Sequence, residues 1–187
     1  MKNNKLFSII LALLVCLSMV VSASATNESE LNFTLESSSS VELLDAAVVK
    51  PGDTITVNVN ISSNPGVLAA IAYVEFDSEE LELVSAKALV EDVKVPEGTV
   101  AGRVSVVVGN TNAAFTPSKY EAVTATGAVA ELTFKVLVEA DGQIAINLKA
   151  TQSNAIDANG KFGKITVNGD VLNVNVLGAD HVCDEKR

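Results

Sequence analysis

Apolar and polar residues alternate over much of this chain, and the alternation predicts β-strands. The clearest case is residues 54–62, in which Ile55, Val57, Val59 and Ile61 are separated by threonine, asparagine and serine. Successive side chains of a strand point to opposite faces, so this segment has one apolar and one polar face. Related patterns recur at residues 66–84, 102–109, 127–138, 143–149 and 165–176. The chain is therefore predicted to be all-β.

Turn signals separate these segments. Proline and glycine at residues 50–53 and 64–66, and Asp141-Gly142, have the composition of tight turns. About nine short strands with frequent turns are typical of a β-sandwich, here with jelly-roll topology. A short alternating patch at residues 31–35 predicts either a first strand or a loose leader.

The stretch at residues 66–84 has an unusual second face. On one side of the predicted strand, Ala70, Ala72, Val74 and Phe76 are all apolar and are assigned to the core. The other side carries the four residues Ala69, Ile71, Tyr73 and Glu75. A half-exposed strand usually has polar residues there. We therefore predict that these four residues bind a protein partner, since an aromatic and an aliphatic residue together are typical of a binding hot spot.

The first 25 residues have the features of a secretory signal peptide. Lys2 and Lys5 precede an apolar run at residues 6–21, and Ala23-Ser24-Ala25 matches the small-residue cleavage pattern. We expect the mature protein to be secreted and extracellular, either free or attached to the cell surface, with no membrane span after signal removal. Beyond the signal, the sequence divides into a polar leader, a β-sandwich domain and a C-terminal tail, at residues 26–40, 41–177 and 178–187.

Charge and cysteine content narrow the class of protein. The formal net charge is −10, and loss of the two signal lysines leaves 11 basic against 23 acidic residues, or −12. This balance disfavours nucleic acid and anionic membranes as partners. Cys183 is the only cysteine outside the signal, so an internal disulfide is not expected.

We expect no catalytic site, metal site or cofactor. The carboxylates at residues 77–82 lie on one predicted turn, whereas a two-carboxylate hydrolase needs groups that converge across a cleft. The single histidine, His181, lies in the tail beside Cys183. Asp157-Ala158-Asn159-Gly160 resembles the start of a calcium loop, but the closing ligands are missing. A hairpin turn explains this segment better.

In their order along the chain, several motifs resemble the cohesin modules of bacterial cellulosomal scaffolds. The resemblance covers residues 41–176. The motifs are at residues 51–54, 64–66, 75–77, 81–83, 102–106 and 126–136. It implies a jelly roll of about nine strands that binds the dockerin modules of polysaccharide-degrading enzymes and has no catalytic role.

The chain departs from this family on the face that the resemblance assigns to the dockerin. Better known members carry polar residues there, whereas this chain has Ala69, Ile71 and Tyr73. The resemblance therefore implies a dockerin-type partner with a more apolar contact surface, or a module that no longer binds dockerins. A second interpretation is that a loop at residues 110–125 covers Ile71 and Tyr73 as a small additional core.

An alternative function is a carbohydrate-binding or adhesive β-sandwich at the cell surface, in which polysaccharide is bound directly. Carbohydrate recognition usually relies on aromatic stacking platforms. The chain has no tryptophan and only two tyrosines, Tyr73 and Tyr120. The composition therefore favours a protein partner over a polysaccharide.

Overall fold

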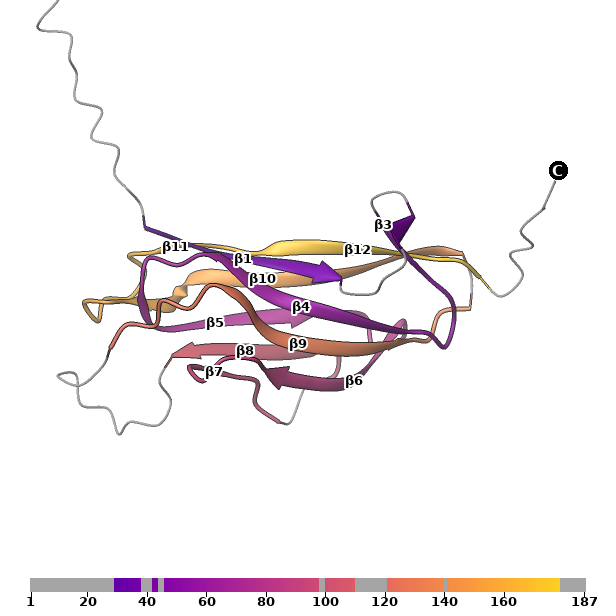
Figure 1. Ribbon diagram of the computed structural model, residues 1–187, viewed down its shortest axis with the longest axis horizontal. Helices are drawn as coiled ribbons and strands as arrows, with labels where there is room; N and C mark the ends of the chain where they lie inside the picture. The colour runs from indigo at the N-terminus through magenta and orange to yellow at the C-terminus, as the bar shows by residue number, and fades with distance from the viewer. Residues whose placement is uncertain are drawn as a thin grey trace, which may run out of the picture.

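The computed structural model describes residues 29–37, 42–43, 46–97, 100–109, 121–139 and 141–178. Its strands form two sheets that pack face to face (Figure 1). The five-stranded sheet has the order β11 (Thr166–Asn168), β1 (Glu30–Ser37), β4 (Thr54–Ser63), β9 (Gly127–Val136) and β6 (Leu81–Ala88). The seven-stranded sheet has the order β2 (Glu42–Leu43), β3 (Ala46–Val49), β12 (Asp170–Val176), β10 (Gly142–Asp157), β5 (Val67–Glu75), β8 (Arg103–Gly109) and β7 (Val93–Lys94).

The chain passes from one sheet to the other at most connections, so neighbouring strands are usually distant in sequence. Strand pairs are antiparallel except β1 with β11 and β3 with β12, which are parallel. Nine strands have four or more residues, and β2, β7 and β11 are shorter. The prediction of an all-β jelly-roll sandwich is confirmed, and the described ranges contain no helix. Within those ranges, therefore, no helix is long and apolar enough to cross a membrane.

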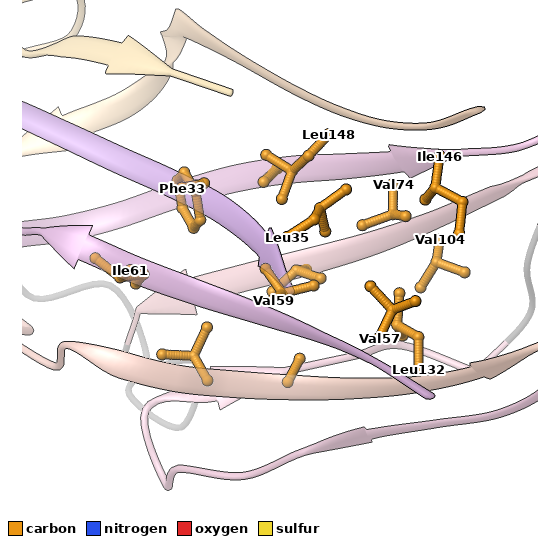
Figure 2. Packing of buried hydrophobic residues seen from close by; sticks show 14 of the residues in the cluster. Phe33, Leu35, Val57, Val59, Ile61, Val74, Val104, Leu132, Ile146 and Leu148 are labelled. Atoms are coloured by element: carbon orange, nitrogen blue, oxygen red, sulfur yellow. The ribbon is translucent and has the colours of Figure 1, made fainter. Parts of the chain in front are cut away.

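One apolar core fills the space between the sheets. The strand alternation places Val57, Val59 and Ile61 of β4 opposite inward residues of β5, β8 and β10, and all three are almost completely buried. Figure 2 shows these side chains meeting Val74, Val104 and others between the sheets. Phe134 is also fully buried. Because the core is apolar and continuous, packing and the hydrophobic effect stabilise the fold.

Residues 30–37 form strand β1. Of the two interpretations of this segment, a first strand and a loose leader, the structure has the strand. Leu31, Phe33 and Leu35 point inward and are at most 6% exposed. The strand pairs with β4 over most of its length and with β11 at its start. The division made from the sequence placed residues 26–40 outside the sandwich, but the described part of this leader contributes three side chains to the core. The predicted signal peptide and C-terminal tail lie outside the described residues, apart from Gly178.

Gly102 is required by the close approach of two backbone segments. Its φ is +74°, and a Cβ built there would lie 2.7 Å from the carbonyl oxygen of Phe76. Its own carbonyl accepts a hydrogen bond from the Phe76 N–H at 2.9 Å. An L side chain is disfavoured by both the dihedral and the contact.

We expect Gly102→Ala to lower the free energy of unfolding by about 1–3 kcal/mol, because either the dihedral or the backbone contact must shift. Urea unfolding of purified protein measures this loss. Gly142→Ala is the matched control, since its φ is not in the left-handed region and its Cβ would meet nothing within 4 Å. Equal stability of the two variants would contradict the steric explanation.

Candidate protein-binding face

The outer surface of strands β10, β5, β8 and β7 is the candidate site. Along β5, the buried residues Ala70, Ala72 and Val74 alternate with half-buried residues. The half-buried residues are the four predicted partner-binding residues, Ala69, Ile71, Tyr73 and Glu75. The structure therefore places all four on one outward face, because the alternation that buries their neighbours turns them away from the core. Their binding role stays a prediction.

Pairing with neighbouring strands joins these residues into an apolar strip. Ile71 lies opposite Val107 of β8, and Ala69 lies opposite Ile156 of β10. Val107 and Ile156 are also half-buried. Because directly paired residues point to the same side of a sheet, both belong to the outer surface. We call Ala69, Ile71, Tyr73, Val107 and Ile156 the apolar strip.

The sequence pattern did not identify Val107 and Ile156 as site residues. Alternation along residues 102–109 places Val107 on the face opposite the buried valines, so its outward direction was readable. Its position beside Ile71 was not, because strand register is a tertiary property. Ile156 follows an irregularity in the β10–β5 pairing after Ala150. Such a shift changes which residues point outward, and simple alternation along β10 cannot anticipate it.

Charged side chains border the strip at Tyr73. The Cζ atom of Arg103 lies 4.9 Å from the centre of the Tyr73 ring. Lys149 pairs with Tyr73 across the strands, and its Nζ lies 2.5 Å from the Glu75 carboxylate. Exposed pairs of this kind contribute at most about 1 kcal/mol each to stability. They place charged groups beside the apolar strip at Tyr73.

The apolar strip does not belong to the main core. The partly buried apolar residues that pack against the core include Phe76, Leu83 and Val95, but none of the strip. In the alternative interpretation, a loop at residues 110–125 covers Ile71 and Tyr73. The structure describes only residues 121–125 of this loop. Val123 of this segment pairs with Val67, the first residue of β5, and residues 110–120 lie outside the described residues. The strip is therefore a half-buried patch that is separate from the main core, and apolar patches on a protein surface are typical of interaction sites.

The segment at Asp157 forms a tight hairpin turn. The Asp157 Oδ1 atom accepts hydrogen bonds from the backbone N–H groups of Lys161 at 2.8 Å and Asn159 at 2.9 Å. Gly160 has a φ of +77°, which a side chain would disfavour. The hydrogen bond from Lys161 is the main reason why the pKa of Asp157 lies below its ordinary value. These hydrogen bonds favour the folded turn above the ordinary aspartate pKa and weaken as the pH falls through the lowered value.

The other residues considered as catalytic or metal-binding candidates do not come together in the part of the chain that the structure describes. Asp77 accepts the backbone N–H of Glu79 at 2.8 Å and so stabilises its own turn. Glu82 lies on β6 of the opposite sheet. Within the described ranges, no three His, Cys, Asp or Glu residues are grouped so that they could hold a metal ion. His181 and Cys183 lie outside the described residues.

Solved structures with similar folds are cohesin modules. A chain of the type I cohesin–dockerin complex from Clostridium thermocellum is 16% identical, with 79% of this chain and 99% of that chain covered and a TM-score of 0.57. The cohesin module of a family 33 glycoside hydrolase from Clostridium perfringens is 13% identical, with 80% and 98% covered and a TM-score of 0.56. A non-cellulosomal cohesin from the archaeon Archaeoglobus fulgidus is 13% identical, with 81% and 94% covered and a TM-score of 0.53. At such identities, the likeness concerns the fold alone.

Sequence comparison assigns the family. No curated protein matches the chain. The family model described as the cohesin domain matches residues 39–175, which is more than half of the chain. The match runs from strand β2 to Asn175 in β12, and so includes every strand of the candidate face. The chain belongs to the cohesin family.

Proposed function

We propose that this protein is a secreted, non-catalytic module that binds a dockerin-type protein module through the outer face of strands β10, β5, β8 and β7. Several of the similar solved structures are cohesin–dockerin complexes. The observation that carries the proposal is the apolar strip, which lies outside the main core and is centred on Ile71 and Tyr73. The proposed role does not require a catalytic group.

The composition of the face suits a protein partner. Protein interfaces commonly have an apolar centre, a polar rim and an aromatic or arginine anchor. Here Ile71 and Val107 form the centre, Tyr73 is the aromatic anchor, and Arg103 and Lys149 form part of the rim. The strands present these side chains on a sheet whose other face is packed against the core, so little conformational entropy is lost when the partner binds.

The apolar strip also constrains the partner. A partner that placed hydrogen-bond donors over Ala69 and Ile71 would leave those donors unsatisfied, at a cost of about 1–3 kcal/mol for each buried group. A matching partner therefore presents aliphatic or aromatic side chains at these positions. This supports a dockerin-type module whose contact surface is more apolar than that expected from the better known family members.

The proposed setting is extracellular polysaccharide catabolism by a bacterium. The N-terminal residues support secretion because they combine a basic start, an apolar run and a cleavage pattern. In this setting the module brings an enzyme that carries the dockerin to its substrate or to the cell surface. Polysaccharide is then reached through the partner.

Direct carbohydrate binding is the alternative, and the arrangement around Tyr73 disfavours it. A sugar ring stacks on an open aromatic face. The guanidinium group of Arg103 lies over the Tyr73 ring, 4.9 Å from its centre. That face of the ring is therefore occupied. For the outer surface of strands β10, β5, β8 and β7, we therefore favour a protein ligand over a sugar.

The test is capture of partners from the secretome of the organism that encodes this chain, with and without a calcium chelator. The family resemblance implies that dockerins fold around calcium, so the proposal predicts that secreted hydrolases are captured and that the chelator releases them. Mass spectrometry identifies the captured proteins. Retention of the protein on insoluble polysaccharide, with no hydrolase captured, would overturn the proposal in favour of the carbohydrate-binding alternative.

A further inference from the structure

Phe162 is the most exposed large apolar residue among those that the structure describes. The residue is 66% exposed, and it lies on the hairpin that follows β10. Phe162 forms an antiparallel bridge with Ile156. The flanking hydrogen bonds run from Asp157 N–H to the Lys161 carbonyl at 3.0 Å and from Gly163 N–H to the Ala155 carbonyl at 3.4 Å. These bonds flank the pair, so Ile156 and Phe162 are a non-hydrogen-bonded pair, in which the side chains lie close together.

The pairing connects Phe162 to the apolar strip. Ile156 lies opposite Ala69, and Ala69 alternates with the buried Ala70. Because members of a direct pair point to the same side of a sheet, Phe162, Ile156 and Ala69 all face outward on the same side. The apolar surface thus continues from Tyr73 and Ile71 along β5 and across the end of β10 to the hairpin.

The hairpin that carries Phe162 is internally braced. Two backbone N–H groups, from Asn159 and Lys161, donate to the Asp157 carboxylate. The Gly160 N–H donates to the Asp157 carbonyl at 3.0 Å. A braced turn holds an exposed aromatic side chain in place before a partner arrives, which lowers the entropic cost of binding.

The candidate face and the outer face of β1, β9 and β6 carry opposite net charge. Strands β10, β5, β8 and β7 present three cations and one anion outward: Lys149, Arg103, Lys94 and Glu75. The outer face of β1, β9 and β6 presents four anions and two cations: Glu30, Glu36, Glu82, Glu131, Lys87 and Lys135. The candidate face is therefore locally positive on a chain whose net charge is −10. Complementary charge on a partner would be negative.

We infer that the docking face extends onto the hairpin at residues 157–163, and that its occupant is an acidic protein module with an apolar anchor that packs on Phe162 and Ile156. The inference rests on the proposed function, because it describes the partner of the same face. It adds a contact made by the hairpin, outside the four strands, and it specifies that the partner surface is negatively charged. Phe162 is a specificity residue in this arrangement, since a module without a matching apolar residue leaves it in water.

The first test uses Phe162→Ala and recombinant, calcium-loaded dockerin modules from the organism that encodes this chain. Isothermal titration calorimetry measures their affinity for the wild-type protein and for the variant. We expect a loss of about tenfold or more, which is typical of an aromatic anchor. Val84→Ala is the control, since Val84 is 56% exposed but lies on β6 of the other sheet. Unchanged affinity for Phe162→Ala would overturn the extension onto the hairpin.

The second test reverses charge. Lys94 pairs with Val107 and lies at the border of the candidate face, so Lys94→Glu should weaken binding severalfold, slow association and reduce its dependence on salt. Lys135→Glu makes the same change on the outer face of the opposite sheet and should leave binding unchanged. Tighter binding by Lys94→Glu would show that the partner surface is not acidic and would overturn that part of the inference.

Failure of the inference can be told apart from failure of the proposed function. If no dockerin module binds the wild-type protein, both are wrong. If binding is lost in Ile71→Ala/Tyr73→Ala but retained in Phe162→Ala, the proposed face stands and the extension onto the hairpin is wrong. If all three variants, including Lys94→Glu, bind as the wild type does, the partner uses another surface and both are wrong.

Discussion

The double variant Ile71→Ala/Tyr73→Ala is expected to lose about 100-fold or more in partner affinity while its melting temperature stays nearly unchanged. Each residue is a candidate hot spot, and hot-spot truncations cost about 2 kcal/mol or more. Neither side chain packs against the main core, so their removal creates no internal cavity. Calorimetric titration with the captured partner and differential scanning calorimetry of the free protein measure the two quantities.

A matched control separates loss of a specific contact from a general change in surface hydrophobicity. Val84→Ala/Leu89→Ala removes two exposed apolar side chains on β6 and just after it, which are 56% and 41% exposed. This control should bind the partner normally. A loss of several kcal/mol of stability in the Ile71→Ala/Tyr73→Ala variant would instead indicate that the chain itself covers these residues as a second core, as the loop interpretation proposes.

The second large effect is expected at Phe33. Phe33→Ala should lower the free energy of unfolding by about 3–5 kcal/mol, because it leaves a cavity in a tightly packed core. Phe33 is 1% exposed and lies among Ile61, Leu148 and other core residues (Figure 2). Urea unfolding, followed by circular dichroism, measures the loss.

Phe162→Ala is the control for this prediction, because it makes the same chemical change at a position that is 66% exposed. Its effect on stability should be within about 0.5 kcal/mol, as for most surface substitutions. If Phe33→Ala were as mild as Phe162→Ala, the segment at residues 30–37 would contribute little to the core. The leader interpretation would then describe it better than strand β1 does.

The sequence by itself was sufficient for the fold class and for the direction of many side chains. Alternation in residues 54–62 predicts that Ile55, Val57, Val59 and Ile61 point inward, and all four are buried. The same local rule turned Ile71 and Tyr73 outward on β5. This information is local because the period of two belongs to the strand itself and requires no knowledge of its neighbours.

The tertiary structure was needed to decide whether the short apolar patch at residues 31–35 is a strand. Three alternating residues cannot form a core by themselves, and an isolated strand is not stable in water. Pairing with β4 and packing against β10 supply the missing partners. For this reason the sequence left both a strand and a loose leader open.

The tertiary structure also decided which residues make up the candidate face. Glu75 and Lys149 are 74 positions apart, yet their side chains form an ion pair because β5 and β10 are neighbours. Phe162 joins the face only through its pairing with Ile156 and the pairing of Ile156 with Ala69. Strand order, register and bulges set these positions, and they arise from long-range pairing that no local pattern encodes. The sequence therefore determined which way each regular strand faces, and the tertiary structure decided which side chains stand together.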